Sequence, residues 1–141
     1  MIYSLPFDVL QHMLEALPVR IFWKDRESRY LGFNQLFADD AGIPDPRSSV
    51  GKTDFYLFPF HQAEIYRYND AEVMLTGVSK TLEEQLTMPD GQVRWIRTHK
   101  MPLRHADGRV IGVAGAYQHI TEQKRLYERL RMEALAEEVS G

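Results

Sequence analysis

Four polar side chains of this sequence could together bind a small polar ligand. Glu84, Lys100, Thr98 and Tyr117 supply a carboxylate, an ammonium group, a hydroxyl and a phenol. They fall in segments with the alternating pattern of β-strands, in which every second side chain lies on the same face. A buried unpaired charge is costly, so Glu84 and Lys100 each require a partner. Two interpretations follow: the four groups hydrogen-bond a ligand, or Glu84 and Lys100 pair with each other or reach solvent at the rim of a sheet.

Sequence signs of catalytic or metal chemistry are missing. The chain contains no cysteine, which excludes disulfides, thiolate zinc sites and cysteine nucleophiles. It has no Gly-x-Ser-x-Gly elbow, no phosphate-binding loop and no catalytic carboxylate pair at a recognisable spacing. His61 and His99 are far apart and do not have the spacing of metal ligands. We predict a protein that is not an enzyme, with no catalytic residues and no metal site.

Composition indicates one globular domain. The chain has 141 residues, of which 44% are hydrophobic and 26% charged, too apolar a mixture for a disordered chain. With 17 basic and 20 acidic residues the net charge is −3, which argues against nucleic acid as a partner. No apolar run approaches the ~20 residues of a membrane span, and no signal peptide is visible. We expect a cytoplasmic protein without direct membrane insertion.

The first third of the chain reads as a helix followed by a hairpin. Apolar residues spaced by three and four, from Leu5 to Leu17, predict an amphipathic helix that Pro18 ends. Residues 19–23 and 29–33 are rich in β-branched and aromatic side chains and flank a polar turn, which predicts two strands.

The rest of the chain predicts helices first and strands afterwards. Three helices are expected: one capped by Asn34, a short one in 51–55 capped by Thr53 or Asp54, and a longer one over 60–75. Three strands follow, over 82–88, 93–103 and 110–120, and a charged helix over 121–139. Strands near both ends with helices between them predict an α+β domain with an antiparallel sheet.

A series of short motifs runs along the chain in a fixed order. They are Lys24-Asp25, Tyr30-Leu31-Gly32-Phe33-Asn34, Gly51-Lys52-Thr53-Asp54-Phe55, Asp90-Gly91, Arg94-Trp95, Pro102-Leu103, Asp107-Gly108 and His119-Ile120-Thr121-Glu122-Gln123-Lys124. Over residues 19–123 the series resembles the PAS domain family of sensory modules, with its C-terminal PAC motif. The resemblance implies a five-stranded antiparallel sheet of order 2-1-5-4-3 with helices on one face. It divides the chain into an N-terminal amphipathic helix (1–18), a core (19–120) and a C-terminal output or coiled-coil helix (121–141).

The resemblance also implies a ligand cavity between the sheet and the helices. We expect the Asp90-Gly91 turn to set Leu86 opposite Ile96. The same register pairs Glu84 with Thr98, and Leu82 with Lys100. The residues expected to line the cavity are Tyr66, Glu84, Leu86, Ile96, Thr98, Lys100 and Tyr117. The other face of the sheet would carry Trp95, Arg97, His99 and Met101, which the helix over 5–17 could cover.

The sequence does not name a cofactor. Haem-binding PAS domains use a histidine within the long central helix, whereas here His61 stands near the start of that helix. Flavin photosensors of the family need a reactive cysteine, so this chain could hold a flavin only non-covalently. Tyr66 and Tyr68 on the same helix are either core residues or a stacking surface for a planar ligand. His119 replaces the aspartate usual at the junction before the last helix, and it is either an exposed strand-end residue or a pH-responsive one.

The resemblance implies a sensory and dimerisation module of a larger signal-transduction protein. A small ligand or cofactor would bias the core between two conformations, and the C-terminal helix would carry the change to an effector. The effector would be a kinase, as in two-component systems, or a cyclic-nucleotide enzyme. The stripe of Leu126, Leu130 and Ala134 suits a parallel two-helix coil in a homodimer. The alternatives are a constitutive dimerisation module without ligand and a haem or flavin redox sensor.

Overall fold

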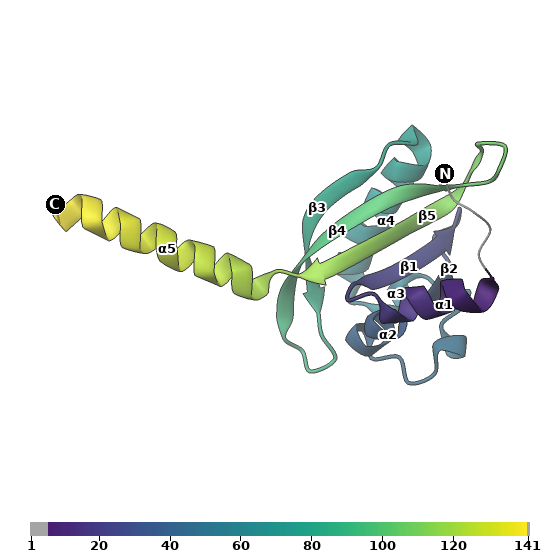
Figure 1. Cartoon of the computed structure of the whole chain (residues 1–141), viewed down its shortest axis with the longest axis horizontal. Helices are drawn as coiled ribbons and strands as arrows, with labels where there is room; N and C mark the ends of the chain where they lie inside the picture. Colours follow the sequence, from purple (N-terminus) through teal and green to yellow (C-terminus); the bar gives the residue numbers. More distant parts are fainter. Residues whose placement is uncertain (1–5, 141) are drawn as a thin grey trace.

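The computed structural model describes residues 6–140, which form one sheet, helices packed on it and a long helix that leaves it (Figure 1). In chain order the elements are α1 (Phe7–Ala16), β1 (Arg20–Asp25), β2 (Tyr30–Phe33), α2 (Gln35–Ala41), the 3-10 turn η1 (Pro46–Ser48), α3 (Asp54–Leu57), α4 (Phe60–Thr76), β3 (Lys80–Thr87), β4 (Val93–Arg104), β5 (Val110–His119) and α5 (Thr121–Ser140). Each predicted helix and strand is present, with ends that differ by a few residues.

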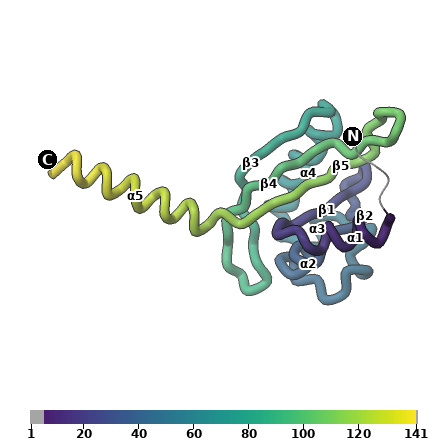
Figure 2. The backbone as a smooth tube through the Cα atoms, in the orientation of Figure 1, coloured from purple at the N-terminus to yellow at the C-terminus, as the bar shows by residue number. Residues whose placement is uncertain are grey.

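The sheet has five antiparallel strands in the order β2-β1-β5-β4-β3. α2 packs on β1, α4 crosses β3, β4 and β5, and α3 packs against α4 (Figure 2). A cluster of buried apolar side chains fills the space between these helices and the sheet, and it is rich in aromatic residues: Phe22, Tyr30, Phe37, Phe58, Tyr66 and Tyr117. The predicted fold class and strand order are confirmed.

Local sequence signals explain where two of the helices begin and end. The side chain of Asn34 accepts a hydrogen bond from the Phe37 amide and caps α2, as predicted. α2 and α4 end at Gly42 and Gly77, both with a φ of 68°, a left-handed conformation that favours glycine. Asp54, one of the two caps predicted for α3, is instead the first residue of that helix and is fully buried.

The pairing of β3 with β4 differs from the predicted register by two residues. The observed pairs are Glu84 with Ile96, Leu82 with Thr98, and Leu86 with Arg94. The predicted pairs Leu86–Ile96, Glu84–Thr98 and Leu82–Lys100 are therefore wrong. The reason is the loop, in which the Met88 amide donates to the Gln92 carbonyl at 2.8 Å and the Gly91 amide donates to Met88 at 2.9 Å. This loop centres the hairpin on Asp90, and because the shift is an even number, every side chain keeps its face.

α1 lies beside β1 and β2, not over β4. The Asn34 side-chain amide donates to the Leu14 carbonyl at 3.1 Å, and α1 shares a hollow with Trp23 and Phe33. This bond holds the helix near the β2 edge of the sheet, whereas the predicted position was over β4, toward the other edge. The prediction that it covers Trp95, Arg97, His99 and Met101 is wrong, and the last three of these are exposed.

The apolar face predicted for the N-terminal helix is present but uncovered within the described chain. Its exposed members are Val9, Leu10, Met13 and Leu17, and Leu14 is half-buried. Leu5, the predicted start of this face, lies outside the described residues.

α5 projects away from the sheet (Figures 1 and 2). Its base is held at Trp95, whose amide donates to Thr121 Oγ1 at 2.8 Å and whose carbonyl accepts from the Ile120 amide at 2.9 Å. From Arg125 to Ser140 every residue is exposed. The exposed residues include the predicted stripe of Leu126, Leu130 and Ala134. Among the described helices, none combines the length and apolar character needed to span a bilayer.

Candidate functional site

A small cavity lies between the inner face of the sheet and the helices. All seven residues predicted to line it do so: Tyr66, Glu84, Leu86, Ile96, Thr98, Lys100 and Tyr117. The cavity has a volume of about 30 Å³, which is room for about two water molecules. The predicted residues therefore meet at one place, and their binding of a ligand stays a prediction.

The rest of the cavity wall comes from residues that sequence reasoning missed. They are Phe22, Lys24, Tyr30, Phe37, Asp54 and Phe58. The sequence predicts a polar turn from Lys24 onward, but Lys24 belongs to β1 and is 1% exposed. The signal that could have found it is the period of two, because Phe22 and Lys24 lie two residues apart and share a face of the strand.

Two lysines and two aspartates form a buried ion network beside the cavity. Asp70 on α4 bridges the lysines: one carboxylate oxygen lies 2.7 Å from Lys24 Nζ and the other 3.0 Å from Lys100 Nζ. Lys24 Nζ also lies 2.7 Å from Asp54, which accepts a hydrogen bond from the Tyr30 hydroxyl. The four charged side chains are at most 2% exposed. Their mutual contacts offset the cost of removing the charges from water.

The contacts within the network keep Asp70 and Lys24 ionised. Burial would raise the pKa of Asp70, but Lys24 and Lys100 outweigh it and hold that pKa below its usual value. Burial would lower the pKa of Lys24, but the two carboxylates that contact it raise it. Burial, with a neighbouring carboxylate, raises the pKa of Tyr30 well above its usual value, so its hydroxyl remains a donor. Asp70 also had a sequence signal, since it lies one helical turn after Tyr66 on the buried side of α4.

Glu84 is the buried charge that is paired least closely. Its Oε1 lies 3.9 Å from Lys100 Nζ, whereas Asp70 is closer to that lysine. Within residues 6–140, neither Glu84 Oε2 nor Thr98 Oγ1 has a hydrogen-bond partner. Burial raises the pKa of Glu84, and the charge of Lys100 and the neighbouring Thr98 hydroxyl oppose this only in part. The predicted pairing of Glu84 with Lys100 is thus present but loose, and one edge of the cavity is polar and unsatisfied.

Replacing Glu84 with glutamine should stabilise the protein at pH 8 by an amount on the order of 1 kcal/mol. The folded state binds the Glu84 proton more tightly than the unfolded state, because the pKa is raised on folding. Ionisation of Glu84 therefore costs stability as the pH rises above the unfolded pKa, and this cost is absent at pH 4. Glutamine does not ionise, so the gain should be present at pH 8 and vanish at pH 4 in urea unfolding curves.

The control for this prediction is Glu83→Gln, which removes an exposed carboxylate from the same strand. Its effect should stay within about 0.5 kcal/mol at both pH values. A Glu84→Gln variant that is less stable than the parent protein at pH 8 would show that the Lys100 contact outweighs the burial of the charge.

α4 presents Tyr66 to the cavity and Tyr68 to solvent. Tyr66 is 7% exposed, and its hydroxyl donates to the Gln85 carbonyl at 2.5 Å. Tyr68 is 71% exposed. Of the two tyrosines, only Tyr66 is a core residue and only Tyr66 could contact a ligand in the cavity.

A second buried polar cluster joins α2 to the end of β5. Asp40 Oδ2 accepts hydrogen bonds from Arg20 Nε at 2.9 Å, from the Tyr117 hydroxyl at 2.9 Å and from His119 Nε2 at 2.8 Å. The His119 side chain is 20% exposed. The interpretation of His119 as an exposed strand-end residue is therefore wrong, because the packing of α2 on the sheet brings Asp40 to it. No local signal in the sequence pairs residues so far apart.

The residues of the cavity do not fit a haem or a flavin. A volume of about 30 Å³ is far below the roughly 300 Å³ at which pockets for larger ligands begin. His61 is exposed at the start of α4 and is not among the lining residues. Over residues 6–140, no group of three or more histidine, aspartate or glutamate side chains could hold a metal ion. The cavity instead fits a ligand of a few atoms.

Comparison with known families agrees with this geometry. The family model described as PAS fold matches residues 14–125, which is most of the chain. The chain belongs to the PAS family. The resemblance carried by the sequence motifs is confirmed, and the matched range includes the whole sheet and the start of α5.

Curated proteins similar to this PAS domain are much longer than it. The uncharacterized protein y4lL of Sinorhizobium fredii is 34% identical over 102 residues, which cover 69% of this chain and 12% of that protein. The aerobic respiration control sensor protein ArcB of Escherichia coli is 26% identical over 129 residues, covering 86% of this chain and 15% of ArcB. The PAS domain thus resembles a small part of each, and in ArcB that part belongs to a sensor protein.

Solved structures share the fold. A Vibrio VqmA–ligand–DNA complex superposes with a TM-score of 0.76 and 25% identity, covering 84% of this chain and 53% of that one. VqmA bound to DPO superposes with a TM-score of 0.72 and 25% identity, covering 79% of this chain and 57% of that one. The PAS domain of Bordetella pertussis BvgS superposes with a TM-score of 0.58 at 20% identity, covering 90% of this chain and 96% of that one. That last likeness concerns the fold alone.

Proposed function

We propose that this PAS domain is a sensory module that holds a small polar ligand in its cavity. The observation that carries the proposal is the unsatisfied edge of the cavity, where Glu84 Oε2 and Thr98 Oγ1 lack a partner within the described chain. Buried polar atoms without partners are rare in folded proteins. A ligand that bonds to both oxygens and to the nearby Lys100 ammonium group would satisfy them.

Charge and size limit the ligand. The charges of Lys24 and Lys100 are balanced by Asp54 and Asp70, so Glu84 adds one negative charge when it is ionised. We therefore propose a ligand that is neutral or singly positive, with a donor for Glu84 and an acceptor for Lys100. A volume of about 30 Å³ limits it to a few non-hydrogen atoms unless the aromatic walls move. That VqmA is solved with a ligand and bound to DPO supports ligand binding by a fold of this shape.

We further propose that the domain works as a dimer in a larger signalling protein. Its two terminal helices support this, since α1 and α5 each expose apolar side chains that a second copy could cover. α5 would form a parallel coil and carry the state of the core to an effector, which we expect to be a kinase or a cyclic-nucleotide enzyme. The sensor protein ArcB supports this assignment. The DNA in the VqmA complex makes a DNA-binding effector the rival arrangement.

The remaining predictions form part of the same proposal. We propose that the domain is not an enzyme, that it does not itself contact nucleic acid, and that it lies in the cytoplasm. The net charge of −3 supports the second of these.

The second candidate function is a constitutive dimerisation module without a ligand. The small volume of the cavity favours it, because one or two water molecules could satisfy Glu84 and Thr98. Both candidates predict a dimer, and only the first predicts a bound organic molecule.

Native mass spectrometry of the purified chain, without added cofactor, tests the two candidates together. We expect a dimer in which each chain carries the extra mass of a small molecule. In Lys100→Met that extra mass should be lost from most chains, because the variant removes the donor while Asp70 keeps Lys24 as its partner. The matched control is Lys80→Met on β3, whose side chain is 35% exposed and outside the cavity wall.

Two results would count against the sensory proposal. A dimer without extra mass would favour the constitutive module. Retention of the small molecule by Lys100→Met, with circular dichroism showing an intact fold, would remove Lys100 from the site.

A further inference from the structure

Asp40 lies between the ligand cavity and the base of α5. It is in the last turn of α2 and is 4% exposed. Tyr117, which donates to it, is part of the cavity wall. His119, which also donates to it, lies two residues before Thr121, the first residue of α5. One carboxylate therefore contacts both the cavity and the segment that leads out of the sheet.

The carboxylate of Asp40 is held by donors from two strands. Arg20 on β1 donates from Nε at 2.9 Å and from Nη2 at 3.4 Å. A carboxylate offers only acceptors, so His119 Nε2 carries the proton in its contact with Asp40. Burial, followed by the charge of Asp40, raises the pKa of Tyr117 well above its usual value, so the phenol stays protonated and donates. Loss of any one donor leaves a buried carboxylate less well satisfied, which is costly.

The direction of α5 depends on few contacts. Its base is bonded to the backbone of Trp95 through Thr121 and Ile120. On the outer face of the sheet Lys124 lies 4.6 Å over the Trp95 ring and 3.3 Å from the Glu83 carboxylate on β3. On the inner face the described contact is the one between His119 and Asp40. The residues after Lys124 are exposed, and of these Tyr127 and Glu128 share a shallow hollow with Glu83 and Arg97 of the sheet. A small movement at His119 would therefore change the angle at which α5 leaves.

We propose that Asp40 is a positioning residue that couples the cavity wall to the direction of α5. A group that enters the cavity and displaces the Tyr117 ring removes a donor from Asp40. The carboxylate then shifts toward Arg20 and His119, and the end of β5 moves with it. This coupling rests on the proposed relay function, but it requires no particular ligand.

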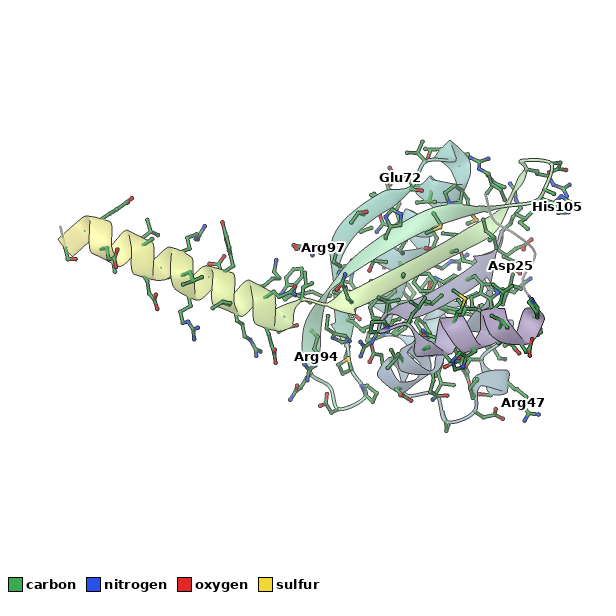
Figure 3. The ribbon with its side chains drawn as sticks, in the orientation of Figure 1. Asp25, Arg47, Glu72, Arg94, Arg97 and His105 are labelled. Carbon is green, nitrogen blue, oxygen red and sulfur yellow. The ribbon has the colours of Figure 1, made fainter. Side chains whose placement is uncertain are left out.

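Distances between spin labels test the coupling. The chain has no cysteine, so labels can be placed at chosen positions without removing native residues. Arg97→Cys places one label on the outer side of β4, near the base of α5 (Figure 3). Glu137→Cys places the other label near the end of α5. Labelled chains are diluted with unlabelled ones, so that distances between protomers are not counted.

The expected result is a narrow distance distribution in the parent protein and one at least about twice as wide in Asp40→Asn. Asp39→Asn is the matched control, because the side chain of that exposed neighbour bonds Gln35 alone among residues 6–140 and its change should leave the distribution as in the parent. His119→Ala should widen the distribution as Asp40→Asn does. His119→Gln retains a donor of similar reach and should restore most of the narrow distribution, which a general loss of packing would not predict.

The cavity side of the coupling is tested without a ligand. Thr98→Leu fills the cavity beside Tyr117, its partner across β4 and β5. The mean distance should shift in this variant and should not shift when Asp40→Asn is also present. If Asp40→Asn does not fold, Tyr117→Phe and His119→Ala, which each remove one donor, decide the question in its place.

The proposal would be overturned if the label-to-label distance distribution of Asp40→Asn matched that of the parent. It would also be overturned if Thr98→Leu shifted the mean distance equally with Asp40 and with Asn at that position. The outcome is separate from the ligand test. If Asp40→Asn widens the distance distribution and the purified protein carries no small molecule, the coupling is supported and the proposal of a bound ligand is rejected. If a small molecule is bound but Asp40→Asn leaves the distance distribution unchanged, the sensory site is supported and the positioning role of Asp40 is rejected.

Discussion

Replacing Asp70 with alanine should destabilise the protein by about 3–5 kcal/mol. Asp70 is fully buried and contacts Lys24 Nζ at 2.7 Å and Lys100 Nζ at 3.0 Å. Without it, Lys24 keeps Asp54, but Lys100 is left with the Glu84 carboxylate at 3.9 Å. A buried ammonium group without a close partner costs more than the original pair gains. Urea unfolding at pH 7 measures the loss.

The dependence of this effect on pH follows from the pKa of Asp70. That pKa is lowered on folding, so Asp70 contributes stability above its unfolded value of 3.8 and loses that contribution as the pH falls through the folded value. The difference between the parent protein and Asp70→Asn, which keeps the side-chain volume, should therefore shrink below pH 3.8. Glu64→Ala, on the exposed side of the same helix, should change stability by less than about 0.5 kcal/mol. A loss below about 1 kcal/mol in Asp70→Ala would show that the network adds little net stability.

Replacing Phe37 with alanine should cost a similar amount, about 3–5 kcal/mol. Phe37 is 2% exposed and lies at the centre of the aromatic core. Its ring centroid is 5.1–6.3 Å from five other rings, those of Phe22, Tyr30, Phe33, Phe58 and Tyr117. The variant loses both the burial of the ring and these contacts, and the surrounding side chains close the space only in part.

Phe37 also lines the cavity, so its truncation should enlarge that cavity. Benzene, which binds engineered apolar cavities, should then raise the melting temperature of Phe37→Ala and leave the parent unchanged. Phe60→Ala is the control, because that ring is 67% exposed and its loss should cost less than about 1 kcal/mol. If Phe37→Ala has the stability of the parent and benzene does not change its melting temperature, the surrounding aromatic side chains must fill the space left by the missing ring.

The sequence determined the elements and their faces through local rules. β-Branched, aromatic and alternating apolar residues marked the strands, and Asn34 marked the start of α2. The faces of β3 and β4 followed from the alternation of side chains along a strand. For this reason the seven cavity residues were found although the predicted strand register was wrong by two residues. A register shift of two residues leaves every side chain on the same face of its strand, whereas the register itself depends on the conformation of one loop.

Tertiary structure decided which charges are buried and which partners they have. Local rules place Lys24, Asp54 and Asp70 in solvent, because an isolated charge is costly in a core. Folding overturns that expectation by bringing β1, α3 and α4 together, so that each charge meets an opposite one. The contact of Asp40 with His119 spans 79 residues and has the same origin. Pairings of this kind depend on which surfaces pack together, and the pattern of a single segment does not contain that information.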